Sequence, residues 1–240
     1  MVVFGSSILG TPEIVGTTFT GQVLGPSQYR TAVLASSPSI YWPLDTNATD
    51  ASPNGRNGTP TNVTFSSPGP GGGLAATFNG TSSFIYENTL HPSAIAAWTL
   101  EAWYRGRGGV TTYTIAPTVG FGSGTFTPST YLDANGLLSG FAFGMAVVQD
   151  PSSSNDGLWH YMVHTYNGAN VMTLYRDGIQ VSQVTSGTPQ NNAGLGLQVG
   201  VGGSLSRGGW FTGDIAHVAI YAGTALSPAT ITSHWQAMYK

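Results

Sequence analysis

Hydrophobic and polar residues follow a strand-like pattern most clearly in residues 155–185. β-Branched and aromatic residues gather there in three short runs, which the dipeptides Asn167-Gly168 and Asp177-Gly178 separate. Asn-Gly and Asp-Gly favour tight hairpin turns because they tolerate positive φ. The pattern therefore predicts an antiparallel meander of three strands, at residues 158–166, 171–176 and 179–185.

The first strand of this meander has no plainly polar face. Because side chains alternate between the two faces of a strand, Trp159, Tyr161 and Val163 share one face. The opposite face carries His160, Met162, His164 and Tyr166. We therefore expect this strand to lie in the middle of a sheet.

Further short apolar runs, bounded by Gly, Pro and Asn clusters, predict strands along the rest of the chain. These runs are residues 39–44, 62–65, 74–78, 83–87, 98–105, 111–116, 119–121, 131–132, 137–148, 195–201 and 213–221. Residues 150–155 are polar and predict a loop before the meander. Many short strands at this spacing are typical of an all-β sandwich or barrel.

Two segments have helical signals instead. Residues 27–35 begin with Ser27, a candidate N-cap, and end shortly before a proline at position 38, so they predict a short helix. Near the C-terminus, Ser227 and Pro228 fit an N-cap and the first helical position, with Leu226 and Ile231 as a hydrophobic staple. The predicted packed face of this second helix consists of Ile231, Trp235, Met238 and Tyr239.

Residues 1–26 show no persistent period, and we interpret them as an extended N-terminal arm, with one domain over residues 27–240. The arm is too short to form a core of its own, yet it contains large apolar residues that need a partner surface. They are Val2, Val3, Phe4, Ile8, Leu9, Ile14 and Val15. We expect the arm to dock on another chain.

Composition agrees with strands and tight turns, because the 240 residues include 34 glycines and 14 prolines. Only 7% of residues are charged, so Ser, Thr, Asn, Gln and Gly must form most of the surface. The net charge of −3 gives no basic field for nucleic acid. The chain contains no cysteine, and no run of residues is long and apolar enough to predict membrane insertion.

Catalytic chemistry has weak support in the sequence. A glycoside hydrolase needs two carboxylates that face each other across the substrate, but the chain has only three glutamates, at 13, 87 and 101. We expect Glu101 to be a structural carboxylate that Arg105 or backbone donors satisfy. His160 and His164 lie about 13 Å apart on one strand face, too far for one metal ion. The sequence therefore predicts a protein that is not an enzyme.

Several motifs, in a fixed order, resemble the laminin-G-like jelly rolls of the concanavalin A-like lectin/glucanase superfamily. The residues that carry the resemblance are Tyr41-Trp42-Pro43-Leu44-Asp45, Phe78-Asn79-Gly80, Trp98-Thr99-Leu100-Glu101-Ala102-Trp103, Asp156-Gly157-x-Trp159-His160, Thr165-Tyr166-Asn167-Gly168, Leu174-Tyr175-x-Asp177-Gly178, and Phe211-Thr212-Gly213 with Val218-Ala219-Ile220-Tyr221. They span residues 29–239. The resemblance implies a two-sheet antiparallel jelly-roll sandwich with short N-terminal and C-terminal helices. Its expected core contains Trp98, Leu100, Ala102, Val163 and Ile220.

The same resemblance implies a possible calcium site, since many such domains bind calcium at one rim through Asp and carbonyl oxygens. Asp45, Asp50 and Asp156 are the candidate ligands. The last strand departs from the family pattern, because Ala216 and His217 stand where the family commonly has two acids. The alternative is that these aspartates only form turns.

Sugar binding requires exposed aromatic rings beside hydrogen-bonding groups. The candidates are Trp210, Phe211, Tyr113 and Tyr131, which lie among Asn, Ser and Thr residues. The alternative is that these rings cover the core or an oligomer interface.

The segment Tyr29-Arg30-Thr31-Ala32-Val33-Leu34-Ala35 before Tyr41-Trp42-Pro43-Leu44 resembles the version of this module in bacteriophage virion proteins and some bacterial surface proteins. The resemblance implies a tail or capsid-attached protein, located in the virion, that adheres to host-surface glycans or decorates the particle. Its expected partners are other virion proteins and further copies of itself, with a cell-surface glycan as the candidate ligand. The alternative is a secreted, extracellular carbohydrate-binding module of a bacterium.

Overall fold

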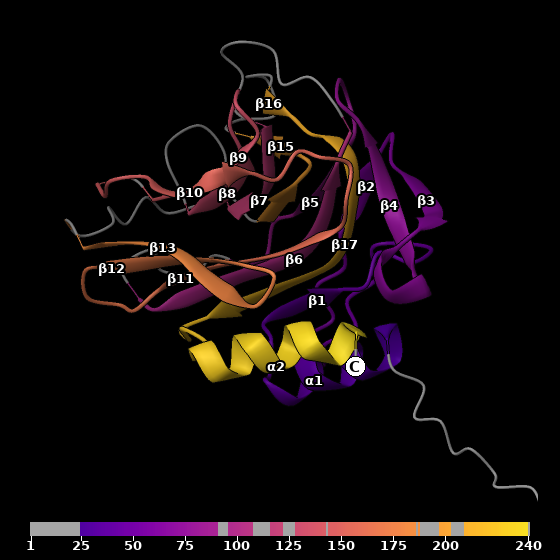
Figure 1. Cartoon of the computed structure of the whole chain (residues 1–240). Coiled ribbons are helices and arrows are strands. Elements are labelled where there is room, and N and C mark those ends of the chain that lie inside the picture. The colour runs from indigo at the N-terminus through magenta and orange to yellow at the C-terminus, as the bar shows by residue number, and fades with distance from the viewer. Residues whose placement is uncertain are drawn as a thin grey trace, which may run out of the picture.

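Two antiparallel sheets stack face to face, and two helices cover the outer face of one of them (Figure 1). The structure is a computed structural model that describes residues 25–90, 96–107, 116–121, 128–142, 144–185, 187, 197–202 and 209–239. The predicted two-sheet antiparallel jelly-roll sandwich, with short helices near both ends, is confirmed.

The first sheet, sheet A, has eight strands among the described residues. Their order is β13 (Ile179–Thr185), β12 (Val171–Arg176), β11 (His160–Tyr166), β6 (Trp98–Gly106), β17 (Thr212–Ala222), β4 (Leu74–Asn79) and β3 (Thr64–Pro68), with β1 (Ile40–Trp42) also paired to β17. The predicted meander is therefore confirmed, and its first strand lies inside the sheet between β12 and β6. Asp177 and Gly178 have φ values of 53° and 77°, the positive values that a tight Asp-Gly turn requires.

The second sheet, sheet B, has seven strands in the described part of the chain. Their order is β10 (Val148–Ser153), β9 (Leu137–Phe141), β8 (Ser129–Leu132), β7 (Ala116–Phe121), β14 (Leu197–Val199), β5 (Phe84–Glu87) and β2 (Thr59–Thr61). Strands β15 (Val201–Gly202) and β16 (Gly209–Trp210) form a small separate ribbon. The short edge strand β2 contains Pro60, a residue that is tolerated at a sheet edge because it donates no ladder hydrogen bond.

Some strand boundaries differ from the prediction. The polar residues 150–155 are a loop in the prediction, but residues up to Ser153 belong to β10. Of the predicted strand at 62–65, only Thr64 and Phe65 lie in a strand, β3, because β2 ends at Thr61 and the next residue, Asn62, has a positive φ of 51°. The predicted strand at 111–116 lies outside the described residues except for its last position. Polarity misled the prediction for β10, since an edge strand exposes polar side chains.

The two predicted helices are α1 (Pro26–Ala35) and α2 (Pro228–Tyr239). Helix α2 has the predicted cap, with the Thr230 N–H donating to Ser227 Oγ at 3.2 Å. The predicted Ser27 cap of α1 is wrong, because Gly25 is the N-cap and Pro26 takes the first turn, where a proline costs no hydrogen bond. No helix of the described residues is long and apolar enough to cross a membrane.

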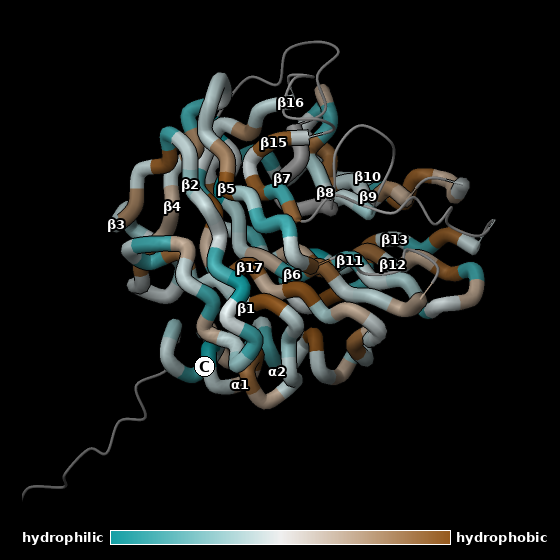
Figure 2. The backbone as a smooth tube through the Cα atoms, turned by 180° about the vertical axis from the view of Figure 1, so that it is seen from behind, coloured by the Kyte–Doolittle hydropathy of each residue, from teal (hydrophilic) through white to brown (hydrophobic). Residues whose placement is uncertain are grey.

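The hydrophobic core has two layers, one on each side of sheet A. The strands of sheet A that lie between them, such as β6 and β17, include hydrophobic residues, shown in brown in Figure 2. Between the sheets, Leu100 and Ile220 of sheet A meet Leu197 of sheet B. Beneath the helices, Trp103 and Val163 of sheet A meet residues of α1 and α2. The five predicted core residues are all buried. Sheet A is thus covered on both faces, which is why β11 has apolar residues on both.

The packed face of α2 differs from the prediction at two positions. Ile231 and Met238 are buried as predicted. His234 is also buried, although the prediction omits it, and Tyr239 is 52% exposed. His234 is accommodated because it pairs with a buried carboxylate, as described below.

A β-bulge in β17 shifts the alternation of its side chains. Ala216 pairs with Trp103 and Ala219 with Glu101, so three steps on β17 oppose two on β6. His217, at the bulge, has a φ of 55° and donates its backbone N–H to the Pro43 carbonyl. The extra residue turns Val218 and Ile220 toward sheet B while keeping Ile215 there as well.

Candidate ligand-binding groove

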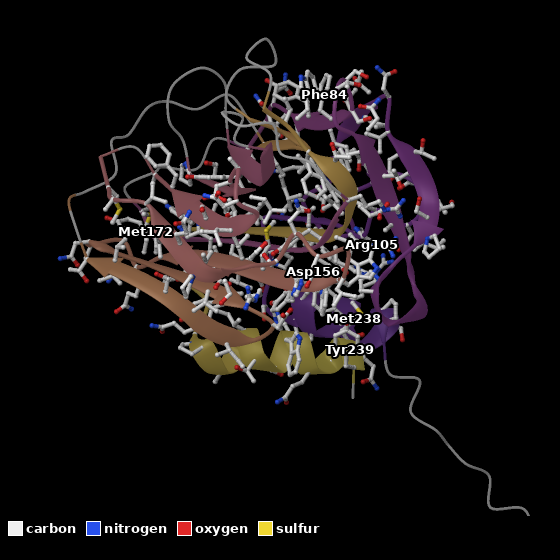
Figure 3. The ribbon with its side chains drawn as sticks, turned by 45° about the horizontal axis from the view of Figure 1, so that its top comes forward. Phe84, Arg105, Asp156, Met172, Met238 and Tyr239 are labelled. Carbon is white, nitrogen blue, oxygen red and sulfur yellow. The ribbon has the colours of Figure 1, made fainter. Side chains whose placement is uncertain are left out.

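A groove of about 500 Å³ lies at the β2–β5 edge of sheet B. Its size suits a small ligand. The residues that line it are Gly55, Arg56, Asn57, Thr59, Thr61, Phe84, Tyr86, Glu87, Asn88 and Thr89. Phe84 lies on the far side of the molecule from α2 (Figure 3), so the groove is remote from the helices.

Aromatic rings form the floor of the groove on strand β5. Ile85 points into the core, so its neighbours Phe84 and Tyr86 face outward and are partly exposed. On the adjacent strand β2, Thr61 lies opposite Phe84 and Thr59 opposite Tyr86. Each ring therefore has a threonine beside it, an arrangement that offers an apolar surface and a hydroxyl to the same ligand.

The loop at one side of the groove is held by a single carboxylate. Asp50 Oδ1 accepts the backbone N–H groups of Tyr41 and Ser52, and Oδ2 accepts the Ser52 hydroxyl and the Arg56 N–H, all within 2.8–2.9 Å. The Arg56 carbonyl accepts the indole N–H of Trp42 at 2.8 Å. These contacts fix the Arg56 backbone at the groove and do not involve its side chain.

The opposite side of the groove is a turn that Glu87 organises. The Glu87 carboxylate accepts the N–H and the hydroxyl of Thr89 and, at 3.0 Å, the N–H of Leu90. Glu87 is only 4% exposed. Both of its oxygens are thus occupied within the turn.

Next to the groove, Gln198 on β14 lies opposite Tyr86 on the outer face of sheet B. Leu197 and Val199, on either side of it, point into the core. Gln198 is 3% exposed, and neither its amide nitrogen nor its amide oxygen has a hydrogen-bond partner. A buried amide without partners is costly, so this position favours an apolar side chain on stability alone.

The four aromatic residues predicted to bind sugar differ in their exposure and in their distance from the groove. The Trp210 ring is partly exposed and lies 6.2 Å from the Phe84 ring, so it is close to the groove without lining it. Tyr131 is on the outer face of sheet B but only 7% exposed. Phe211 is 1% exposed and packs edge-on against Phe78 between the sheets, so its prediction as a ligand contact is wrong. Tyr113 lies outside the described residues.

The three predicted calcium ligands do not come together. Asp50 uses both oxygens on loop donors, and Asp156 accepts the Leu158 N–H and contacts His160. Burial raises the pKa of Asp45, although the positive charge of Arg30 acts to lower it. No three acidic or histidine residues of the described ranges gather in an arrangement that could hold a metal ion. Calcium binding at these residues stays a prediction that the geometry does not support.

Glu101 lies beneath the helices and far from the groove. It is fully buried and pairs with His234 Nδ1 at 3.1 Å, and it accepts the hydroxyl of Tyr29. The predicted partner Arg105 is wrong, because Arg105 pairs with Asp214 at 2.9 Å. Burial alone would raise the pKa of Glu101. The charge of His234 and the hydrogen bonds that Glu101 accepts outweigh burial, so the pKa of Glu101 is lowered. Glu101 is thus a satisfied structural carboxylate, as expected, with a different partner.

The two histidines of β11 have unlike surroundings. His160, at the rim, contacts Asp177 at 2.8 Å and Asp156 at 3.2 Å, and these acids raise its pKa although burial opposes them. His164 is enclosed between the sheets, and burial lowers its pKa to about 3. Neither histidine contacts the groove lining.

The prediction from sequence missed every residue that lines the groove. Alternation within residues 83–87 already placed Phe84 and Tyr86 on one face of a strand, which was the available signal. Arg56 and the threonines of β2 carried no such signal, because they lie in a long polar stretch whose strand pairing with β5 only the structure shows.

With a two-layered jelly roll and a polar-aromatic groove on one sheet, the chain is a lectin-like β-sandwich. Residues 78–232 match the family described as the concanavalin A-like lectin/glucanases superfamily. This match covers more than half of the chain, which therefore belongs to that family. No curated protein sequence matches the chain significantly.

Solved structures share the fold at low identity. The binding domain of Paraclostridial Mosquitocidal Protein 1 has a TM-score of 0.65 and 15% identity, covering 84% of this chain and 52% of that one. Domain 4 of AbnA, a GH43 extracellular arabinanase from Geobacillus stearothermophilus in complex with arabinotriose, has a TM-score of 0.63 and 21% identity, covering 83% and 98%. The binding domain of botulinum neurotoxin serotype G has a TM-score of 0.64 and 11% identity, covering 83% and 50%. The chain thus spans about half the length of the two toxin domains.

Proposed function

We propose that this chain is a non-enzymatic, glycan-binding jelly roll of a bacteriophage particle, attached to the tail or the capsid. The observation that carries the glycan-binding part is the groove in which Phe84 and Tyr86 each lie beside a threonine. Sugars present apolar C–H faces and rings of hydroxyls, so aromatic surfaces next to hydroxyl and amide groups suit them. The arabinanase domain, solved with arabinotriose, supports a sugar as the ligand of this fold.

The non-enzymatic part of the proposal is supported by the position of the acids. Glu101 is bound to His234 and Tyr29 on the helix-covered face of sheet A, and Glu87 is bound within its own turn. Neither carboxylate offers a free oxygen to a glycosidic bond. A general acid and a second carboxylate would need to face each other across the substrate.

The virion part of the proposal is supported by the sequence resemblance of residues 29–35 and 41–44 and by the apolar residues of the N-terminal segment. Attachment through residues 1–24 leaves the groove free, because Gly25 and α1 lie on the helix side of the molecule (Figure 1). In a particle protein that is attached in this way, the groove faces the solvent outside the particle.

A second candidate is a secreted bacterial carbohydrate-binding module. Its support is the arabinanase domain, of which the match covers 98%. The two candidates share the ligand class and differ in assembly. A mass measurement of the purified full chain separates them: a closed oligomer supports the particle protein, and a monomer supports the secreted module.

Glycan binding is tested by probing an array of neutral and acidic oligosaccharides with the full chain and two variants. Phe84→Ala removes a groove ring, and Tyr239→Ala removes an exposed ring on α2 as the matched control. We expect Phe84→Ala to weaken the strongest signal about tenfold or more and the control to leave it unchanged. Equal binding by both variants would place the sugar site elsewhere.

A further inference from the structure

Arg56 lines the groove and forms no ion pair with any described residue. Three other described arginines form ion pairs: Arg105 and Arg107 with Asp214, and Arg176 with Asp150. Arg56 forms none with any described residue, and its Nη1 is buried without a hydrogen-bond partner. A guanidinium nitrogen that has lost water and gained no acceptor is costly, so the site is predisposed to accept an oxyanion.

The nearby carboxylates do not supply this acceptor. Asp50 binds the backbone N–H of Arg56 and three further donors, so its oxygens are already occupied. Glu87 lines the same groove, but its oxygens accept donors from Thr89 and Leu90. Neither carboxylate therefore pairs with the Arg56 guanidinium, which keeps its donors for a ligand.

The rest of the groove indicates what else the ligand must carry. A cavity of about 500 Å³ is much larger than a single inorganic anion needs. Phe84 and Tyr86 offer ring surfaces, while Thr59 and Thr61 offer hydroxyls. A ligand that satisfies all three features has an oxyanion, an apolar face and several hydroxyl groups.

We propose that the groove binds an acidic sugar unit, in which a carboxylate or sulfate pairs with the Arg56 guanidinium and the sugar ring lies on Phe84 or Tyr86. This inference rests on the proposed glycan-binding function and adds the charge of the sugar. The planar guanidinium can donate two parallel hydrogen bonds to either oxyanion. Binding is expected to weaken as salt rises, because the groove is open to solvent and the pairing is screened.

The test measures binding of the full chain to three probes by calorimetric titration. Trigalacturonic acid carries carboxylates, its carboxyl-reduced form is the neutral match, and a sulfated galactan trisaccharide carries sulfates. The variant is Arg56→Gln, and the matched control is Arg30→Gln, which removes an equal charge from an exposed position on α1. Arg56→Gln keeps the two backbone contacts of residue 56, so the loop is expected to stay folded.

We expect an acidic probe to bind about tenfold or more tightly than the neutral one, and Arg56→Gln to abolish that preference while Arg30→Gln preserves it. A preference for one acidic probe over the other identifies the carboxylate or the sulfate as the recognised group. If neutral and acidic sugars bind equally and Arg56→Gln changes nothing, the acidic-sugar inference is wrong while glycan binding stands. If no sugar on the array and none of the three probes binds, the proposed function fails together with the inference.

Discussion

Replacing Glu101 by Gln tests whether the buried pair beneath the helices joins them to sheet A. Glu101 and His234 are 0% and 2% exposed, and their atoms lie 3.1 Å apart. Removing one partner of a buried pair typically costs about 3–5 kcal/mol, because the other charge is left uncompensated. Gln keeps an oxygen that can accept from Tyr29 and His234, so we expect the lower end, about 3 kcal/mol. For a domain of this size that corresponds to a loss of about 6–12 °C in Tm.

The stability that the Glu101–His234 pair contributes depends on pH. Burial would lower the pKa of His234, but Glu101 raises it. A raised folded-state pKa contributes stability that is complete below the ordinary histidine value near 6.5 and is lost as pH rises through the raised value. The lowered pKa of Glu101 contributes stability that is lost only as pH falls through that lower value. The pair therefore stabilises the fold most at mildly acidic to neutral pH.

The assay is urea unfolding of the full chain, followed by tryptophan fluorescence between pH 5 and 9. We expect the free-energy difference between wild type and Glu101→Gln to be largest near pH 6 and to shrink toward pH 9. Sugar binding should be unchanged at pH 7, where both proteins remain folded, because Glu101 lies on the helix side of sheet A. A difference that is below about 1 kcal/mol, or one that grows as pH rises, would refute the account of the pair.

Three further predictions follow from other parts of the fold. His164 and His217, whose pKa values burial lowers to about 3, are expected to reduce stability as pH falls below about 6.5, which His164→Gln should lessen in acid unfolding. Gly140→Ala should cost about 1–3 kcal/mol in urea unfolding, because the added Cβ would lie 2.6 Å from the His164 ring; an unchanged midpoint would contradict this packing. Gln198→Leu should leave stability unchanged or raise it by about 1 kcal/mol, and a clear loss would show that its amide is satisfied.

The role predicted for the N-terminal segment is tested by deleting residues 1–24. The deletion keeps Gly25 and Pro26, which begin α1. We expect a folded sandwich with nearly unchanged Tm that no longer forms oligomers or joins a particle. Unfolding of the truncated chain would assign the segment to the core, and normal assembly would place the docking surface elsewhere.

Local sequence rules were sufficient for the central strands and the turns. The Asp177-Gly178 turn and the two-sided apolar pattern of β11 need only positive φ and alternation, and both are found as predicted. The bulge at His217 could not be predicted, because an extra residue in a strand changes no composition and shifts only the register with β6. Strand β10 was not predicted, because the polar side chains of residues 150–153 are also typical of a loop.

The candidate site was less accessible to sequence reasoning than the fold. Phe211 and Trp210 are adjacent in sequence, yet one is in the core and the other is on the surface, because neighbours point to opposite faces. The groove forms where β2 pairs with β5, two segments that are more than twenty residues apart. Likewise, the partners of Glu101 come from both helices, and only tertiary packing brings Tyr29 and His234 to it.

Glycan binding in the groove is tested most directly by a crystal structure of the full chain with the oligosaccharide that binds most strongly. We predict a sugar ring against Phe84 or Tyr86 in the groove between β2 and β5, with an acidic group of the sugar within hydrogen-bond distance of the Arg56 guanidinium. A sugar bound on another surface, with the groove empty, would show that the groove is not the ligand site.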